Sequence, residues 1–170
     1  GAKHGKQVVA WEEIGQAQLL PGTLMQQWNT EPARVAPTLQ AVAQGARVIM
    51  SPANRVYLDM QYTPDTPLGL NWAGRVEVRD AYDWDPADYV QGVGEVHIAG
   101  VEAPMWAETL RKIDEVEFMA FPRLPGVAEI AWSPREGRSW EEYRGRLAAQ
   151  APYWDALGIR YYRSTQVDWP

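Results

Sequence analysis

Four short apolar runs set the hydrophobic pattern of this chain. They span residues 7–11, 23–28, 47–50 and 95–101. We interpret runs of this length, bounded by Gly, Pro and Ser, as buried strands. Because no hairpin turn joins one run to the next, the strands should be parallel and connected by crossovers. The sequence therefore predicts an α/β fold.

Helical patterns and one long irregular segment separate or follow these runs. Residues 31–44 have helical composition and place apolar side chains on one face. Residues 109–131 are mostly helical in pattern, with interruptions expected near Pro122 and Pro125, and residues 139–142 have the sequence of a capping box that opens another helix. Residues 51–94 are rich in Pro, Gly, Asp and aromatic residues, and a loop of that length in a compact domain is usually functional.

Parallel strands that alternate with helices suggest part of a barrel. Four strand–helix units are half of an eight-stranded (β/α)8 TIM barrel, in which catalytic residues follow the carboxyl ends of the strands. A small doubly wound sheet would also fit the alternation, but no glycine-rich phosphate loop follows any run. We therefore expect half of a barrel, with its functional residues at the strand ends.

Tryptophans stand close to several of these predicted strand ends. The chain has 9 tryptophans among 170 residues, and acidic residues lie near Trp11, Trp28 and Trp106. The flat face of an indole packs against the C–H bonds of a pyranose ring, and carboxylates accept hydrogen bonds from its hydroxyls. This pattern indicates a carbohydrate site, although a core position is the alternative for each tryptophan taken alone.

Composition and charge exclude several classes of partner. The net charge is −6, from 16 basic and 22 acidic residues, and the absence of a basic stripe argues against nucleic acid. The chain has no cysteine, and its two histidines, His4 and His97, lack metal-ligand spacing, so we expect neither a metal nor a cofactor. No apolar run is long enough to cross a membrane, and no signal peptide is evident.

Three strings resemble glycoside hydrolase family 20, the β-N-acetylhexosaminidases, and its actinobacterial members in particular. They are SPANRVYLD at residues 51–59, GVEAPMWAE at residues 100–108 and FPRLPGVAE at residues 121–129. The resemblance runs from about residue 6 to the end of the chain. It implies that residues 1–170 are the C-terminal half of the catalytic (β/α)8 barrel, strands five to eight, and that the N-terminal half is absent.

The chain departs from the family pattern in one respect that matters for catalysis. The family carries an Asp-Glu pair in a His-x-Gly-Gly-Asp-Glu setting, and no such motif occurs here; Asp114 and Glu115 stand in a charged helical context. The start at Gly1, without a methionine, also suggests a piece of a longer protein. We expect the isolated chain to be inactive, with the missing half of the same enzyme as its partner, or to form a homodimer through its open sheet edges.

The resemblance also implies a reaction and a set of contacts. The family hydrolyses terminal GlcNAc or GalNAc residues by substrate-assisted retaining catalysis, in which the 2-acetamido oxygen attacks the anomeric carbon. Tyr57 is implied as the catalytic contact that donates its hydroxyl to this oxygen. The implied substrate-binding residues are Trp11, Trp28 and Trp106 around the acetamido group, Trp72 beside the sugar, and Asp59 and Glu108 as acceptors for O4 and O6.

Two other functional classes fit some of the same residues. A non-catalytic carbohydrate-binding module is the main alternative, because the catalytic pair is absent. A structural interaction domain is a third hypothesis, but it leaves the strand-end aromatic residues unexplained. Three tryptophans away from the strand ends, Trp132, Trp140 and Trp154, are interpreted as packing residues. The parent enzyme is expected to be secreted or extracellular.

Overall fold

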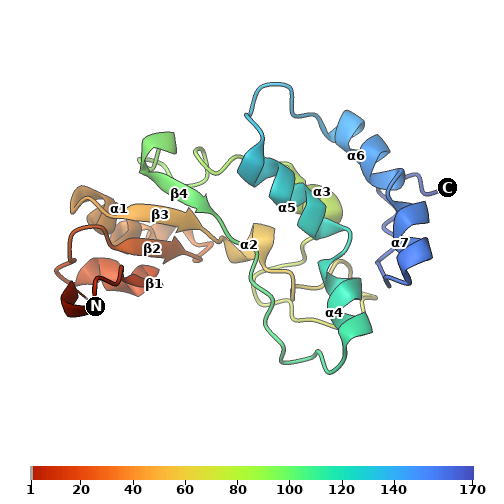
Figure 1. Cartoon of the computed structure of the whole chain (residues 1–170), viewed down its shortest axis with the longest axis horizontal. Helices are drawn as coiled ribbons and strands as arrows, with labels where there is room; N and C mark the ends of the chain where they lie inside the picture. The colour runs from red at the N-terminus through yellow and green to blue at the C-terminus, as the bar shows by residue number, and fades with distance from the viewer. Residues whose placement is uncertain (1) are drawn as a thin grey trace. The chain divides into compact units, whose positions relative to one another are not determined.

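The structure is a computed structural model that describes residues 2–170, and the chain forms two compact units (Figure 1). The first unit consists of Gly1–Ala53 and Asp85–Glu102, and the second of Asn54–Trp84 and Ala103–Pro170. The first contains the sheet, and the second contains most of the irregular segment predicted from the sequence. No helix within the described residues is long and apolar enough to cross a membrane.

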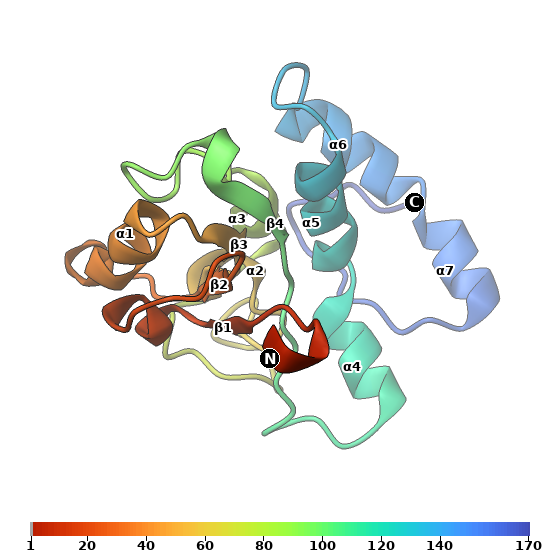
Figure 2. The same cartoon turned by 60° about the vertical axis from the view of Figure 1, so that its left-hand side comes forward.

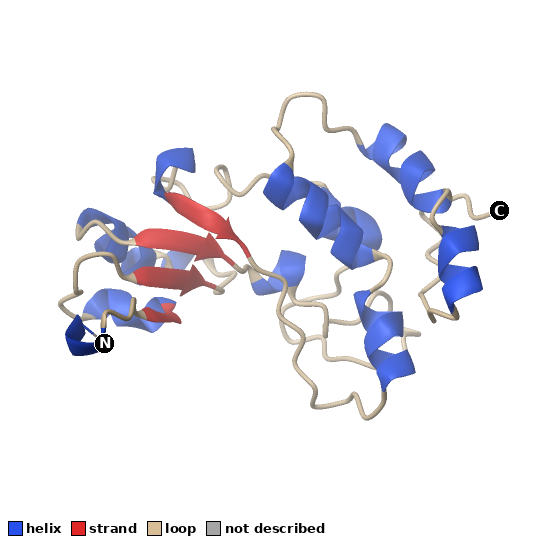
Figure 3. Cartoon of the chain, in the orientation of Figure 1, coloured by secondary structure: helices blue, strands red, loops and turns tan. Residues whose placement is uncertain are grey.

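A parallel four-stranded sheet forms the centre of the first unit, with its strand arrows pointing the same way in Figure 3. The strands, in spatial order, are β1 (Val9–Trp11), β2 (Leu24–Gln27), β3 (Arg47–Met50) and β4 (Ile98–Val101). Four parallel strands are as predicted. The fourth begins later than expected, because Glu95–His97 form the 3-10 helix η4, in which the His97 side chain accepts the backbone N–H of Gly94.

Alternate residues of the two central strands are buried. Met25 and Gln27 on β2 are fully buried, as are Val48 and Met50 on β3, and the register pairs Met25 with Val48. Helix α1 (Ala36–Ala43) contacts both strands. The period-two burial means that one face of these strands carries the packing.

Short 3-10 helices complete the first unit: η1 (Ala2–His4), η2 (Glu12–Gln16) and η3 (Pro32–Arg34). Helix η2 follows β1 directly and packs closely on α1. A Cβ atom at Gly15 would lie 1.9 Å from the carbonyl oxygen of Pro37, so only glycine permits this approach. The contact fixes the chain that leaves the carboxyl end of β1.

Six helices lie in or lead into the second unit. They are α2 (Ala53–Val56), α3 (Val78–Tyr82), α4 (Ile113–Ala120), α5 (Arg123–Trp132), α6 (Trp140–Ala148) and α7 (Ala151–Leu157). Helices α3 and α5 pack against each other, and α4 leads into α5 (Figure 2). The predicted break near Pro122 occurs between α4 and α5. The break expected at Pro125 was wrong, since this proline lies in the first turn of α5, where no backbone donor is lost.

Two further predictions about this unit need correction. Helix α6 begins after Ser139 as expected, but the Ser139 side chain makes no capping hydrogen bond. Trp132 was expected to pack and is 89% exposed. It lies two positions beyond the buried Ile130, which turns it to the other side of α5. Trp154 is buried against Tyr161, as predicted.

Candidate functional site

An aromatic cluster of Tyr57, Trp72 and Trp106 lies in the second unit. The ring centroid of Tyr57 is 6.0 Å from that of Trp72, edge-on at 81°, and 6.1 Å from that of Trp106, tilted at 57°. The Tyr57 side chain is buried, whereas Trp72 is 54% exposed and Trp106 is 41% exposed. The cluster therefore presents two open indole surfaces beside a fixed phenol ring.

The Asp59 carboxylate is buried next to this cluster. It is 1% exposed, and neither of its oxygens accepts a well-formed hydrogen bond from any residue that the structure describes. Burial raises the pKa of Asp59, and the charge of the exposed Glu108 raises it further, while the nearby backbone N–H of Trp106 lowers it. Buried acceptors normally have partners. A polar ligand that donates to Asp59 would satisfy this one.

Backbone hydrogen bonds join the segments that carry these side chains. The N–H of Leu58 donates to the carbonyl of Pro104 at 2.8 Å, and the N–H of Leu70 donates to that of Asp59 at 2.9 Å. The N–H of Gln61 donates to the carbonyl of Leu70 at 2.7 Å. The structure thus brings together five residues that the sequence marked as separate candidates: Tyr57, Asp59, Trp72, Trp106 and Glu108.

The other two candidates, Trp11 and Trp28, belong to the first unit. Trp11 is the last residue of β1, and Trp28 follows β2 directly, so both stand at carboxyl ends of neighbouring strands. The indole N–H of Trp28 donates to Glu13 at 3.1 Å. These positions are those at which parallel barrels place functional residues.

Glu12 holds the chain at Trp28 and was missed by the sequence interpretation. One oxygen of its buried carboxylate accepts the backbone N–H groups of Trp28 and Asn29, each at 3.1 Å. Burial raises the pKa of Glu12, and these two donors lower it in part. The only sequence signal was a glutamate immediately after a strand, which is the position from which a side chain can reach the next strand end.

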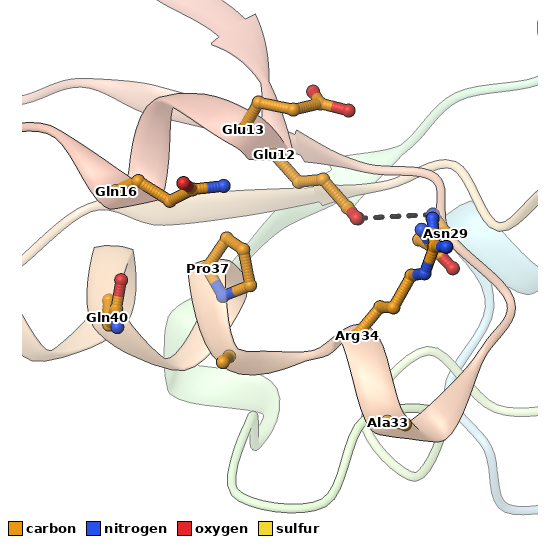
Figure 4. A pocket seen from close by; sticks show the side chains of 9 residues that line it. Glu12, Glu13, Gln16, Asn29, Ala33, Arg34, Pro37 and Gln40 are labelled. Atoms are coloured by element: carbon orange, nitrogen blue, oxygen red, sulfur yellow. Dashed lines mark hydrogen bonds between the residues drawn. The ribbon is translucent and has the colours of Figure 1, made fainter.

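A cavity of about 420 Å³ lies in the first unit (Figure 4). Its lining is mixed polar and apolar and consists of Glu12, Glu13, Gln16, Asn29, Ala33, Arg34, Ala36, Pro37 and Gln40. In Figure 4 the carboxylate of Glu12 and the side chain of Arg34 both point toward Asn29. Neither Trp11 nor Trp28 lines the cavity, so it does not contain the acetamido contacts expected from the sequence.

A polar connection across three strand ends was also missed. The amide of Gln26 donates to Glu102 at 2.6 Å, and the hydroxyl of Ser51 donates to the same oxygen at 3.0 Å. These residues stand at or just after the ends of β2, β3 and β4. Within residues 2–170, no group of three or more histidine or carboxylate side chains has the arrangement of a metal site.

In the single Asp-Glu dipeptide, ion pairs stabilise the charged form of Asp114. Asp114 pairs with Lys112 at 3.1 Å and with Arg160 at 3.2 Å. The hydrogen bond from Lys112 lowers the pKa of Asp114, whereas a general acid near neutral pH needs a raised pKa. Glu115 accepts the backbone N–H of Arg111 at 2.7 Å. Both carboxylates thus make their contacts at the start of α4.

Comparison with known proteins identifies the family. The model described as glycosyl hydrolase family 20, catalytic domain, matches residues 2–135. This chain belongs to glycoside hydrolase family 20. It is 48% identical over 166 residues to a β-N-acetylhexosaminidase of Cellulomonas fimi, and the match covers 98% of this chain and 33% of that protein.

Solved family 20 structures match the fold closely. The β-N-acetylhexosaminidase of Streptomyces coelicolor A3(2) is 54% identical with a TM-score of 0.96, over 99% of this chain and 35% of that one. A Streptomyces plicatus β-hexosaminidase variant, solved in complex with the product GlcNAc, is 53% identical with a TM-score of 0.96, over 99% of this chain and 34% of that one. The chain thus spans about a third of these relatives, and the predicted resemblance to family 20 and the α/β class with a parallel sheet are confirmed.

Proposed function

We propose that this chain is part of a β-N-acetylhexosaminidase that removes terminal non-reducing GlcNAc or GalNAc by substrate-assisted retaining catalysis. It would supply strands five to eight of the barrel, the C-terminal half, and its partner would be the N-terminal half of the same enzyme. Coverage of only about a third of each relative supports this division. The family model describes a catalytic domain, which is why we favour an enzyme over a non-catalytic sugar-binding module.

The observation that carries this proposal is the aromatic cluster beside the buried Asp59 carboxylate. Two half-exposed indoles offer flat apolar surfaces for the faces of a pyranose ring. The Asp59 carboxylate, buried without a well-formed hydrogen bond, is an acceptor for a sugar hydroxyl, and we assign Glu108 as a second acceptor. Together they would bind the O4 and O6 side of the ring.

The proposed reaction uses the substrate's own acetamido oxygen as the nucleophile. This oxygen attacks the anomeric carbon as the glycosidic bond breaks, which gives a cyclic oxazolinium ion that water then opens with net retention. Tyr57 would donate its hydroxyl to the attacking oxygen and fix its direction. Trp106 would confine the acetamido group, and the contacts of Trp11 and Trp28 with that group stay predictions from the family resemblance. Holding a nucleophile in a reactive pose can supply several kcal/mol, about 7–11 in the best intramolecular cases.

The acid that protonates the leaving oxygen would come from the N-terminal half. The Asp-Glu dipeptide of this chain lacks the His-x-Gly-Gly-Asp-Glu setting, and its side chains instead bind Lys112, Arg160 and the backbone of Arg111. Secretion of the parent enzyme, and dimerisation of the isolated chain through the outer strands β1 and β4, stay predictions.

A substrate comparison tests the proposal. We expect the full-length enzyme to hydrolyse p-nitrophenyl N-acetyl-β-glucosaminide with a kcat/KM at least about 10³-fold above that for p-nitrophenyl β-glucoside, because only the former carries the intramolecular nucleophile. The two substrates share the same leaving group, so the difference reports on the group at C2. Similar values for both would contradict a role for the acetamido group.

A further inference from the structure

The side chain of Arg123, at the start of α5, is fully buried in the second unit. Its Nη1 atom donates to the carbonyl oxygens of Met60 at 2.7 Å and Val76 at 2.9 Å. Its Nη2 atom donates to those of Leu58 at 2.5 Å and Met119 at 2.7 Å. One guanidinium thus connects four backbone carbonyls, and three of them belong to the segment between α2 and α3.

The charge of Arg123 has no carboxylate partner in an ion pair within residues 2–170. Its guanidinium carbon instead lies 3.9 Å from the ring centroid of Tyr62, and Tyr62 stacks on Tyr162 at 4.1 Å. Burying a charge is costly, and here four hydrogen bonds to carbonyls and the face of Tyr62 offset that cost.

The four carbonyls point to what the arginine does. Leu58 and Met60 are the two neighbours of Asp59, so the hydrogen bonds from Arg123 hold the peptide unit that precedes Asp59 and the peptide unit that follows Met60. Gly69 packs against the same segment, where an added Cβ would lie 2.5 Å from the carbonyl oxygen of Asp59. Arginine alone offers a planar fork that can donate to so many acceptors at once.

We propose that Arg123 is a positioning residue that holds the backbone around Asp59 so that its carboxylate meets a sugar hydroxyl in a fixed place. This inference rests on the proposed function, in which Asp59 binds the sugar. The charge supports the same role, because the positive guanidinium lowers the pKa of Asp59 and so opposes the effects of burial and of Glu108. Arg123 would thereby favour the ionised form, which accepts hydrogen bonds from hydroxyls most strongly.

The test uses the full-length enzyme and compares p-nitrophenyl N-acetyl-β-glucosaminide with its 4-deoxy and 6-deoxy analogues. Losing a hydrogen bond to a charged group costs about 10- to 100-fold in kcat/KM, so one analogue should be poorer by that factor in the unaltered enzyme. Asp59→Ala identifies which analogue reports on Asp59, because it abolishes that preference. We expect Arg123→Lys and Arg123→Met to lower the same preference by at least about fivefold.

Arg144→Met is the matched control. Arg144 is a partly exposed arginine whose ion pairs are with Glu141 and Asp168, and its replacement should leave the preference unchanged. Arg123→Lys keeps the charge and most of the volume, and we expect it to fold. If neither Arg123 variant folds, Tyr62→Leu replaces them, because it removes the ring that packs against the guanidinium. We then expect Tyr62→Leu to lower the preference over the deoxy analogue by at least about fivefold.

Each outcome decides between separate claims. A folded Arg123 variant with a lower melting temperature but an unchanged preference would show that Arg123 only stabilises the core, and the inference would be overturned. An unchanged preference in Asp59→Ala would instead remove Asp59 from the sugar site, so that the site assignment in the proposed function fails, and the Arg123 inference with it. A loss in Asp59→Ala and in Arg123→Lys, but not in Arg144→Met, supports both.

Discussion

Replacing Tyr57 by phenylalanine in the full-length enzyme is expected to lower kcat by about 10²-fold or more, with a much smaller change in KM. The proposed hydrogen bond runs from the Tyr57 hydroxyl to the acetamido oxygen, which becomes more strongly polarised as it attacks the anomeric carbon. An interaction that strengthens toward the transition state raises kcat rather than ground-state affinity. The ring itself is buried between two indoles, so its packing should survive loss of the hydroxyl.

Steady-state kinetics with p-nitrophenyl N-acetyl-β-glucosaminide measure this effect. Tyr153→Phe is a suitable control, because that tyrosine is 67% exposed on α7 and should give kinetics like those of the unaltered enzyme. A Tyr57→Phe variant with an unchanged kcat and only a raised KM would show that Tyr57 binds the substrate without assisting the attack.

The 170-residue chain on its own is expected to release no nitrophenol from the same substrate. The proposed general acid lies outside it, and general acid catalysis is typically worth about 10²–10⁴-fold. Its Asp-Glu dipeptide is outside the family motif and is engaged in ion pairs and a backbone hydrogen bond at the start of α4. The purified chain should therefore match a Glu108→Gln control prepared in the same way.

Activity of the isolated chain above that control would contradict this division of the enzyme. It would mean that an acid within the chain is competent, and Asp59 or Glu12 would then be the first to test, since burial raises the pKa of each. Co-expression with the rest of the enzyme gives the complementary result, and recovery of hydrolysis there is the expected outcome.

The pattern of apolar runs predicted the sheet well, because each run forms a single strand with no competing local signal, although only the central strands β2 and β3 contain buried residues. All four strands were located to within three residues, and parallel pairing followed from the absence of hairpin turns. Helix ends were harder. Ser139 has the residue type of a cap without the hydrogen bond, and Pro125 is tolerated because it falls in a first turn. Whether a serine caps a helix, or a proline is tolerated in it, depends on the residue at which the helix begins, and composition does not determine that residue.

Some features of the candidate site could be predicted from the sequence, and others could not. Tryptophans near strand ends and the family strings indicate Tyr57, Asp59 and Trp106 from the sequence alone. Burial of Asp59 without a well-formed hydrogen bond could not be predicted, since it depends on how three distant segments meet. The role of Arg123 could not be predicted either, because every residue has a backbone carbonyl and the sequence does not show which of them an arginine will bind. Contacts to side chains can be inferred from residue types, whereas contacts to the backbone cannot.

If the acetamido group of the substrate is the nucleophile, as we propose, the rate must depend on how readily its oxygen donates electrons. The kcat/KM of the full-length enzyme would be measured with p-nitrophenyl glucosaminides that bear N-acetyl, N-fluoroacetyl, N-difluoroacetyl and N-trifluoroacetyl groups. Each fluorine withdraws electron density from the attacking oxygen, while the leaving group stays the same. We expect a steep and continuous fall in kcat/KM along the series. A flat series would contradict it, because a carboxylate of the enzyme would then be the nucleophile.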